Sequence, residues 1–481
     1  MNFRPVLLVI GILLTILAMA MVLPAVLDLA GGHPDWQVFA VSAGCTLFVG
    51  VSLILANRGT TRRFNLRQGF IMVTFSWLAL TLFGALPLAF SELDMSFTDA
   101  FFESMSGITT TGSTVIVGLD SVPPGLLLWR AILQWLGGLG IIVMAIAILP
   151  ILRIGGMQIF KVEAFDTEEK VLPKAAQMSG ALTGIYVSLT LAWAIALWGA
   201  GMNGFEAVAH AMTTIATGGF STSDGSVGHF NSATIDMIII AGMVVGSLPF
   251  LVYMRMMRGD FRSLVTDSQI RWFLAIAGSV VLACTLFLWL QAEVEPVTAL
   301  RFAAFNCISV MTGTGFATTD YGQWGAFATP LFFLIMVIGG CAGSTTCGIK
   351  IFRFQVVFAA AVTQMKTLLQ PHGVFVPYYN KRPITDEIIA SVLGFIFLFG
   401  LSFSVLAIVL GMMGLDYITA MSSAATAIAN VGPGLGDEVG PAGTFTNLPD
   451  GAKWVMSFGM LLGRLELFTV LVLFTRSFWR G

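Results

Sequence analysis

The sequence predicts an all-α integral membrane protein with ten transmembrane helices: two N-terminal helices, then four pseudo-repeats of helix, re-entrant pore helix, filter turn and helix around one pore. Three observations predict this class. Hydrophobic residues make up 57% of the 481 residues and charged residues only 10%, whereas a soluble domain carries roughly 25% charged residues. Long apolar stretches recur along the chain, and four shorter ones each end in a glycine-rich or threonine-rich turn. A soluble globular protein is therefore excluded.

The ten long stretches each approach or exceed the length of about 20 residues that a helix needs to cross a bilayer. We expect spanning helices over residues 5–28, 36–56, 68–90, 126–150, 179–201, 232–254, 271–291, 327–350, 386–412 and 453–476. The first is too long for the apolar part of a typical signal peptide, so we expect it to be retained. The corresponding units are 1–67 (the N-terminal pair) and four pore repeats at 68–153, 154–258, 259–382 and 383–481.

Basic residues gather on one side of the expected membrane. With Arg4 inside, 20 of the 24 Lys and Arg fall on that side, the exceptions being Arg130, Arg301, Lys453 and Arg464. Because cytoplasmic loops carry an excess of Lys and Arg, both termini are predicted to be cytoplasmic. The inner segments 154–174, 255–271 and 353–382 could dock a soluble partner or face anionic lipid, and the sequence does not separate these alternatives.

Four outer connections differ from ordinary loops. Each contains a weakly apolar stretch of about a dozen residues: Phe97–Ile108, Gly204–Ile215, Val297–Val310 and Leu415–Ile428. Such a stretch is too short to span and too apolar to prefer water. Irregular backbone at membrane depth is tolerated only where it is buried in protein or lines a water-filled cavity. We therefore expect four re-entrant half-helices, each followed by a buried turn.

The four turns align without gaps. They are Thr109–Thr114, Ala216–Ser221, Thr312–Ala317 and Ala429–Gly434, and they align on Gly112, Gly219, Gly315 and Gly432. The aligned glycines are 107, 96 and 117 residues apart. A self-similar period near 100 residues indicates four equivalent structural units. Around one axis these units would hold their glycines at the same depth.

Such a ring suits a bare cation. Backbone carbonyls can replace the hydration shell of an ion without a fixed charge, so the ion can leave again. Glycine tolerates the backbone angles that this requires, and the C-terminal end of each half-helix favours a cation. Close packing of helices is the alternative for glycines elsewhere, such as Gly137 and Gly463. The candidate filter residues are Thr110, Thr111, Gly112, Thr217, Gly218, Gly219, Thr312, Gly313, Thr314, Gly315, Asn430, Val431 and Gly432.

The eighth predicted helix is interrupted by ten residues rich in glycine and hydroxyl side chains, Gly339–Gly348. We expect an intramembrane loop that obstructs the pore below the filter; a kink or a glycine-capped helix end is the alternative. Arg464 lies deep in the last predicted helix, where a charge is costly and faces a cavity or a partner. It could bind the loop, or form an ion pair with Glu466 of a neighbour or with Glu103. The candidate gate residues are Gly339, Gly340, Gly343, Ser344, Thr345, Thr346, Cys347, Gly348 and Arg464.

Two other classes of function compete with a pore. A cation-coupled secondary transporter, driven by sodium or protons, also uses broken helices. It would need a buried carboxylate, for which Glu103 and Glu466 are the candidates. A membrane enzyme is not expected, because the chain has no H-E-x-x-H, G-x-S-x-G or Walker A motif. We expect no covalent cofactor and no nucleic-acid partner.

Taken together, these motifs resemble the Trk/Ktr/HKT superfamily of potassium transporters. Segment Gly339–Lys350 looks like the family's intramembrane gating loop, Arg464 sits where the family has a pore-facing arginine, and the N-terminal helix pair matches the TrkH branch. The resemblance implies potassium as the permeant ion, bound by filter carbonyls, in the cytoplasmic (inner) membrane of a bacterium. It also implies a homodimer with one pore per subunit, and a cytosolic TrkA-like regulatory subunit that binds NAD or ATP.

Two details qualify the resemblance. Some plant relatives that transport sodium have serine at the first filter position, where this chain has Gly112, which favours potassium. The chain departs from the family pattern at Cys347, where glycine is expected, and this bears on the flexibility of the gating loop.

Overall fold

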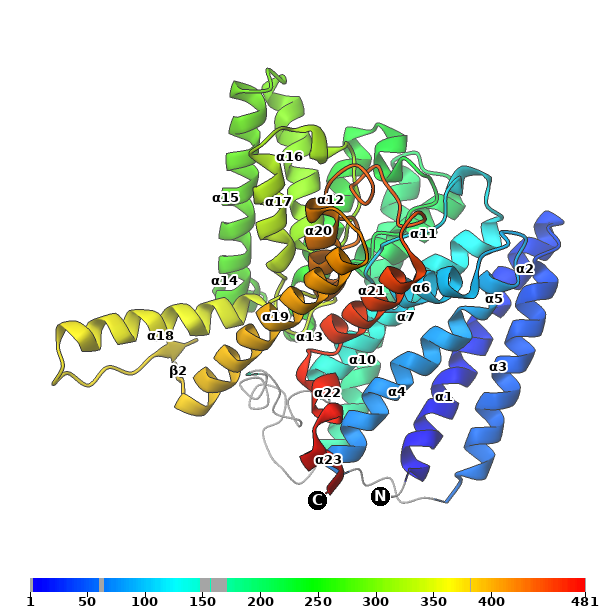
Figure 1. Ribbon diagram of the computed structural model, residues 1–481, viewed down its shortest axis with the longest axis horizontal. Coiled ribbons are helices and arrows are strands. Elements are labelled where there is room, and N and C mark those ends of the chain that lie inside the picture. Colours follow the sequence, from blue (N-terminus) through cyan, green and yellow to red (C-terminus); the bar gives the residue numbers. More distant parts are fainter. Residues whose placement is uncertain (1–2, 60–64, 148–155, 157–170, 381, 481) are drawn as a thin grey trace.

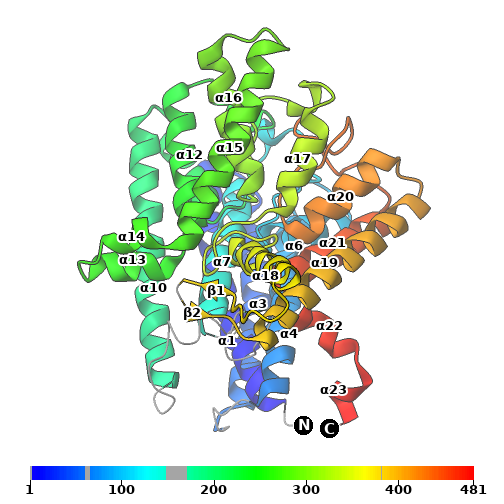
Figure 2. The same cartoon turned by 90° about the vertical axis from the view of Figure 1, so that its left-hand side faces the viewer.

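The structure is a computed structural model that describes residues 3–59, 65–147, 156, 171–380 and 382–480. Within these residues the chain forms a bundle of helices, and its two ends lie side by side at one end of the bundle (Figures 1 and 2). Several predictions lie outside the described residues. They are the boundary at 153–154 between the first two repeats, and the basic residues Arg62, Arg63, Arg153, Lys161, Lys170 and Lys381.

Seven helices within the described residues are long and apolar enough to cross a membrane. This confirms the all-helical membrane class, because a chain in lipid must satisfy its backbone hydrogen bonds internally. They are α1 (Arg4–Ala20) with α2 (Val22–Gly31), α3 (Trp36–Ala56), α4 (Leu66–Gly84) with α5 (Leu86–Ala89), α7 (Pro124–Ala147), α10 (Val171–Gly199), α15 (Ser268–Leu290) and α19 (Asp386–Met412).

Two predicted continuous spans are instead broken. Residues 232–254 form α12 (Ala233–Ser247) and α13 (Phe250–Met257), bent by 92°. Pro249 explains this break, because proline cannot continue a helix and pushes the preceding residue, Leu248, into extended backbone. Residues 453–476 form α21 (Asp450–Arg464), then α22 (Phe468–Leu471) and η6 (Val472–Phe474), with a bend of 108°.

The predicted eighth span is interrupted, as the sequence predicts. Only α17 (Ala328–Val337) is helical, and residues 338–350 form a loop closed by a short bridge between Ile338 and Ile349. The chain continues into α18 (Ile351–Leu369), which reaches out from the bundle beside the hairpin of β1 (Tyr378–Tyr379) and β2 (Arg382–Pro383) (Figures 1 and 2). The interruption itself is where the sequence predicts it.

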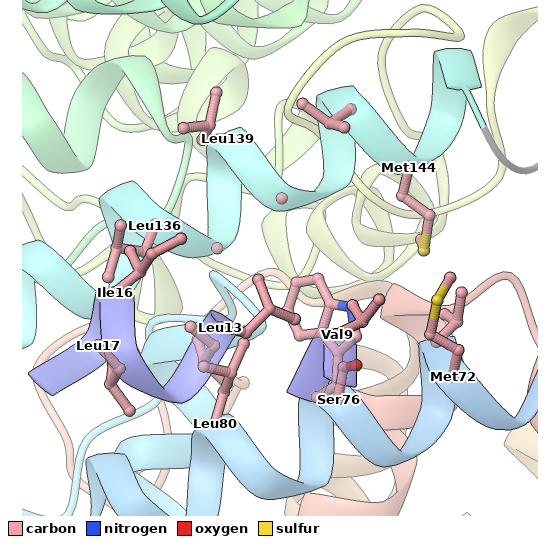
Figure 3. A pocket seen from close by; sticks show the side chains of 16 residues that line it. Val9, Leu13, Ile16, Leu17, Met72, Ser76, Leu80, Leu136, Leu139 and Met144 are labelled. Atoms are coloured by element: carbon pink, nitrogen blue, oxygen red, sulfur yellow. The ribbon is translucent and has the colours of Figure 1, made fainter. Parts of the chain in front are cut away.

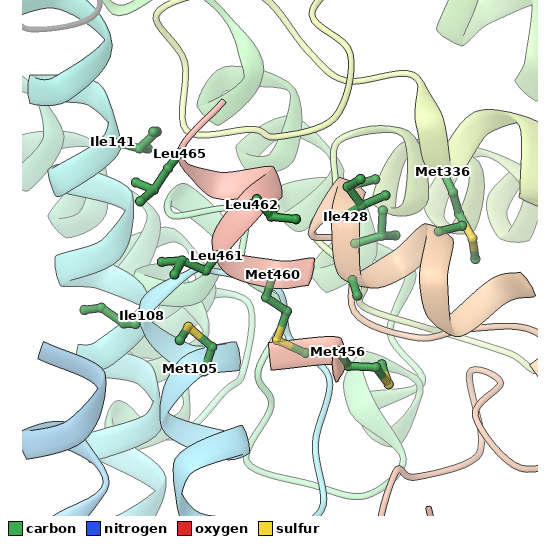
Figure 4. Packing of buried hydrophobic residues seen from close by; sticks show 14 of the residues in the cluster. Met105, Ile108, Ile141, Met336, Ile428, Met456, Met460, Leu461, Leu462 and Leu465 are labelled. Carbon is green, nitrogen blue, oxygen red and sulfur yellow. The ribbon is translucent and has the colours of Figure 1, made fainter. Parts of the chain in front are cut away.

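Four short helices precede the four predicted turns: α6 (Phe97–Ile108), α11 (Gly204–Ile215), α16 (Pro296–Met311) and α20 (Tyr417–Ala429). Their bounds agree with the predicted half-helices to within two residues. Around α6 and α20, side chains such as Met105, Ile428 and Met460 pack in one buried cluster with α21 (Figure 4). The remaining short elements are η1 (Leu119–Ser121), η4 (Ser226–Phe230), α14 (Arg262–Thr266), η5 (Tyr321–Gln323) and α23 (Arg476–Arg480).

Candidate functional site: four turns above an intramembrane loop

Each of the four short helices has a strong start signal in its sequence. Ser96 and Asn203 cap α6 and α11 through their side chains, Pro296 occupies the first turn of α16, and Asp416 caps α20. Hydrogen bonds from the side chain and backbone of Thr419 hold the pKa of the Asp416 carboxyl below its ordinary value. These caps fix where each helix begins, and so where its C-terminal end lies.

The four helices end in the same way. In each turn one amide donates to a carbonyl five residues earlier: Thr111 to Ser106 (2.8 Å), Gly218 to Thr213 (2.9 Å), Thr314 to Ser309 (2.9 Å) and Val431 to Thr426 (3.1 Å). The residue before each of these amides has positive φ: Thr110 (53°), Thr217 (50°), Gly313 (67°) and Asn430 (53°). This is the Schellman ending of a helix, repeated four times.

A second left-handed residue follows two positions later in every turn. It is the aligned glycine: Gly112 (φ 89°), Gly219 (78°), Gly315 (82°) and Gly432 (112°). The residue between the two has no positive φ, so the sign of φ alternates along each turn. Threonine is β-branched and resists positive φ. Residues held in such sparsely populated backbone regions cluster at functional sites, and Thr110 and Thr217 belong to this class.

The four turns meet in a closed ring. A Cβ built on Gly112 would lie 2.2 Å from the carbonyl oxygen of Gly218, and one on Gly219 would lie 1.8 Å from that of Thr314. The same construction puts Gly315 at 2.2 Å from the Val431 oxygen and Gly432 at 2.9 Å from the Thr111 oxygen. Each glycine thus lies against the carbonyl that precedes the glycine of the next turn, and the fourth turn returns to the first.

This ring has the chemistry of a cation site. Its walls are backbone carbonyls, four helix C-termini converge on it with their partial negative charge, and its candidate residues carry no ionisable side chain. Oxygens of this kind can replace the water around a dehydrated cation. All the predicted filter residues lie in these four turns or at the helix ends that lead into them.

Side chains brace the turns from behind. The Thr109 and Thr111 hydroxyls lie 2.8 Å apart, and the Thr312 and Thr314 hydroxyls lie 2.7 Å apart. The side-chain amide of Asn430 donates to the Thr111 hydroxyl (2.9 Å) and so joins the fourth turn to the first. Gln134 of α7, which the sequence did not single out, donates to the Gly218 carbonyl and accepts from the Phe220 amide. These side-chain hydrogen bonds therefore hold the turns in place.

A cavity of about 290 Å³ opens above the ring, on the side where the turns continue into the outer loops. Residues of three turns and of the loops beyond them line it, including Gly112, Gly219, Gly315, Pro433, Arg130 and Asp224. The cavity gives an ion a partly polar approach to the ring, so we call it the outer vestibule.

The loop at residues 338–350 lies on the opposite side of the ring. Thr345 accepts a hydrogen bond from Thr217 of the second turn (3.0 Å) and donates to the Gly246 carbonyl at the end of α12 (2.9 Å). The Cys341 amide donates to the next carbonyl, that of Ser247 (3.0 Å). Ser344 and Thr346 hydroxyls lie 2.8 Å apart within the loop. The loop is thus an ordered, buried plug attached to the break between α12 and α13.

Arg464 ends α21 and binds this loop. Its guanidinium donates to the Thr345 carbonyl (3.0 Å), to the Cys347 sulfur (2.8 Å) and to the Gly137 carbonyl of α7 (2.9 Å). Within this chain neither glutamate pairs with Arg464: Glu466 forms a buried ion pair with Arg353, and Glu103 forms one with Arg130. Gly137 and Gly463 pack against the last carbonyls of α6 and α20, in agreement with close packing.

The space between loop and arginine is nearly closed. Gly343, Thr346, Cys347, Gly348 and Arg464 help to line a cavity of about 10 Å³, which is room for about one water molecule at most. The buried Lys350 side chain donates to the Thr346 carbonyl at its edge. A hydrated ion cannot pass this point in the described arrangement. The predicted gate residues Gly339 and Gly340 lie at the start of the same loop, with the Gly340 amide bonded to Thr346 (3.1 Å).

A separate apolar groove of about 380 Å³ lies between α1, α4 and α7 (Figure 3). Leu13, Met72, Leu80 and Leu136 are among the side chains that line it (Figure 3). Since its lining is hydrophobic, this groove is not a path for ions.

One set of aligned polar positions behind the turns was missed by sequence reasoning, which named only Glu103 and in another role. Nine residues before each aligned glycine stand Glu103, His210, Asn306 and Ser423, all buried. Three of these side chains bond the chain just after the glycine of their own repeat: Glu103 to the Val115 amide, His210 to the Ser221 hydroxyl, and Asn306 to Thr318. In the fourth repeat the neighbouring Ser422 takes this role with Leu435. Polar residues at one aligned position of an apolar helix were the available signal.

Comparison with known proteins gives full-length matches. A family profile described as TrkH, cation transport protein, matches residues 36–480. The Trk system potassium uptake protein TrkI of Halomonas elongata is 44% identical over 483 residues, which is 100% of this chain and 97% of the relative. TrkH of Salmonella typhimurium is 39% identical, with 100% of both chains covered. The crystal structure of the potassium transporter TrkH from Vibrio parahaemolyticus matches all of both chains with a TM-score of 0.92 at 36% identity.

Proposed function

Because the chain belongs to the TrkH family of cation transport proteins, we propose that it takes up potassium through one pore, lined by the carbonyls of the four turns and gated by the loop below them. It is a transport protein rather than an enzyme. The single observation that carries the proposal is the closed ring, in which each turn glycine lies against a carbonyl of the next turn. An ion on the axis of this ring would be coordinated by main-chain oxygens from four directions.

The residues of the proposed filter are those predicted from the sequence. They are Thr110, Thr111, Gly112, Thr217, Gly218, Gly219, Thr312, Gly313, Thr314, Gly315, Asn430, Val431 and Gly432. Their alternating φ signs and their side-chain braces support this assignment. We propose the same repeat limits that the sequence predicts: 68–153, 154–258, 259–382 and 383–481, after the N-terminal pair of helices at 1–67.

The proposed gate consists of residues 339–348 with Arg464. Its closed form is supported by the cavity of about 10 Å³ and by the three hydrogen bonds from Arg464. Opening requires the loop to leave Thr217 and Arg464 together, since both hold Thr345. The positive charge of the Arg464 guanidinium also repels cations while it lies beside the path.

A coupled transporter remains the alternative, driven by sodium or protons. The two carboxylates that it would need, Glu103 and Glu466, are each paired with an arginine. A carboxylate committed to a buried ion pair is a poor site for a coupling proton, because protonation would leave the arginine unpaired. This observation favours conduction.

We further propose that the protein resides in the cytoplasmic membrane of a bacterium with both termini in the cytoplasm, where the basic segments lie. The relatives are named as parts of a Trk system, and we expect a homodimer with one pore per subunit and a cytosolic, TrkA-like subunit that binds NAD or ATP. The inner segments would face that subunit and anionic lipid.

The test is growth of a potassium-uptake-deficient bacterium at limiting potassium. We expect the wild-type chain to restore growth, and the Gly315→Ser variant to lose the preference for potassium over sodium, because a Cβ at residue 315 meets the Val431 oxygen at 2.2 Å. Failure of the wild type to restore growth when it is present in the membrane would overturn the proposed function. Equal potassium preference in both proteins would overturn the filter assignment.

A further inference from the structure

A buried ion pair stands behind the first turn on its vestibule side. Glu103 of α6 and Arg130 of α7 are 0% and 1% exposed, and the Arg130 Nε donates to Glu103 Oε1 at 2.8 Å. Charges at this depth are costly unless paired. The pair does not belong to the filter carbonyls or to the gate, so its position needs another explanation.

Glu103 holds the chain that leaves the first turn. Its Oε2 accepts from the Val115 amide (2.9 Å), and its Oε1 accepts from the Thr114 hydroxyl (3.0 Å). Thr114 and Val115 are two and three residues beyond Gly112. The carboxylate therefore fixes the outer end of the first filter turn.

Arg130 carries this attachment across to the second repeat. One of its terminal nitrogens donates to the Ser221 carbonyl (3.0 Å), two residues beyond Gly219, and the other donates to the Thr114 hydroxyl (3.1 Å). Its guanidinium carbon lies 4.1 Å from the centre of the Phe220 ring, within the range of a cation–π contact. One side chain thus contacts the outer ends of two adjacent turns.

The residues aligned with Glu103 in the other repeats make fewer contacts between turns. Asn306 binds Thr318, Thr319 and the Phe302 carbonyl, all in its own repeat. Between the second and third repeats the link is made by the backbone and a serine, from Gly228 and Ser226 to Ala317. Between the fourth and first repeats Ser113 donates to the Gly432 carbonyl (2.7 Å). The first and second turns are linked by Arg130, by Gln134, which bonds Gly218 and Phe220, and by Asp224, which accepts from the Gly118 and Leu119 amides. Among these, Arg130 is the side chain that contacts Thr114 and Ser221 at once.

We propose that Glu103 and Arg130 are positioning residues for ion selection, which set the spacing between the first and second filter turns from the outer vestibule. This inference rests on the proposed potassium pore. A filter discriminates between ions by the placement and field of its carbonyls, and a guanidinium that holds two turns through a rigid fork restricts that placement. Without the fork, the Gly112 and Gly219 carbonyls gain freedom to close around a smaller cation.

The experiment compares potassium and sodium permeability of the full-length protein in liposomes. Arg130→Lys keeps a positive charge for Glu103 but lacks the fork that reaches Ser221. We expect the potassium-to-sodium ratio to fall roughly tenfold, equivalent to about 1.4 kcal/mol between the two ions, while potassium itself still permeates. Glu103→Gln, which keeps the shape but removes the partner charge, should lower the ratio at least as much.

The control is a second ion pair, with a buried carboxylate and a partly exposed arginine, for which no contact with the turns is found among the described residues. Arg301 Nε donates to Asp236 Oδ2 at 2.6 Å between α16 and α12. Asp236→Asn should leave the ratio unchanged; a loss as large as that of Arg130→Lys would show a general effect of breaking buried pairs and would overturn the proposal.

Gly315→Ser separates this inference from the proposed function. If Gly315→Ser lowers the ratio and Arg130→Lys leaves it at the wild-type value, the filter stands and the positioning role is refuted. If the wild type shows no potassium permeability, the proposed function fails instead. Should Glu103→Gln not assemble in the membrane, Arg130→Lys alone decides.

Discussion

Alanine at the four turn glycines should damage ion selection in an order set by the structure. Real Cβ contacts essentially never lie below 3.0 Å, and the built Cβ atoms lie 1.8 Å from the facing carbonyl oxygen at Gly219, 2.2 Å at Gly112 and Gly315, and 2.9 Å at Gly432. The facing carbonyl must therefore retreat by about 1.2 Å, 0.8 Å, 0.8 Å and 0.1 Å, respectively. Binding groups tolerate displacements of about 0.5 Å, so only Gly432→Ala falls within tolerance.

The expected order of lost potassium preference is Gly219→Ala, then Gly112→Ala with Gly315→Ala, then Gly432→Ala. We expect a fall in the potassium-to-sodium ratio of at least about tenfold, or about 1.4 kcal/mol, for the first three, and less than about threefold for Gly432→Ala. All four share the cost of a non-glycine residue in the left-handed region, about 1–2 kcal/mol. That common cost cannot produce an order, so the order reports the carbonyl displacement.

The assay is ion permeability of the purified variants in liposomes, with Gly201→Ala as the control. Gly201 has φ 109° but would place its Cβ in open space, so this variant carries the backbone strain alone. An equal loss for Gly432→Ala and Gly219→Ala would refute the steric reasoning. A comparable loss for Gly201→Ala would show that strain, and not the ring, is responsible.

Three further predictions concern the gate and its surroundings. Arg464→Ala removes the hydrogen bonds to Thr345, Cys347 and Gly137, so potassium flux through the full-length protein should rise; unchanged flux in a well-expressed variant would refute the role of this arginine. Cys347→Gly removes only the contact with sulfur, and Cys347 has no positive φ that would require glycine, so flux should rise less than in Arg464→Ala; an equal rise would make the thiol contact the dominant restraint. Glu466→Gln removes the carboxylate charge that pairs with the buried Arg353 guanidinium. Breaking a buried pair costs about 3–5 kcal/mol, so thermal unfolding should begin several degrees lower; an unchanged midpoint would show that the pair is not needed for stability.

Composition was sufficient to predict the spans that run straight, because about 20 apolar residues in lipid have few alternatives to a helix. It was not sufficient for the broken ones. Pro249 is the signal in the sequence for the break between α12 and α13. No comparable signal precedes the break after α21. There Glu466 and Leu467 adopt positive φ, and the tertiary contacts of Arg464 and Glu466 accompany the turn.

The candidate site also has features that the sequence predicts and features that it does not. The aligned glycines follow from the sequence because each occupies a backbone position that glycine suits, and the backbone repeats where side chains do not. The partners of the buried charges do not follow. Glu103 and Arg130 are 27 residues apart, and Arg353 and Glu466 are 113 apart. Hydropathy gives the depth of a charge in the membrane, but not which of several helices faces it.

The four repeats share main-chain geometry at the axis and differ in the side chain that holds the outer end of each turn. The Schellman endings and the alternating φ recur in each turn, while the supports are a glutamate, a histidine, an asparagine and a serine. An ion on the axis interacts with carbonyl oxygens and is screened from the groups behind them, so any side chain that places those oxygens correctly serves equally well. It follows that the supports are where one repeat can be tuned without altering the others. The link from Arg130 to Ser221 crosses between repeats, so a change there alters the relation of two turns, whereas a change at Asn306 alters one.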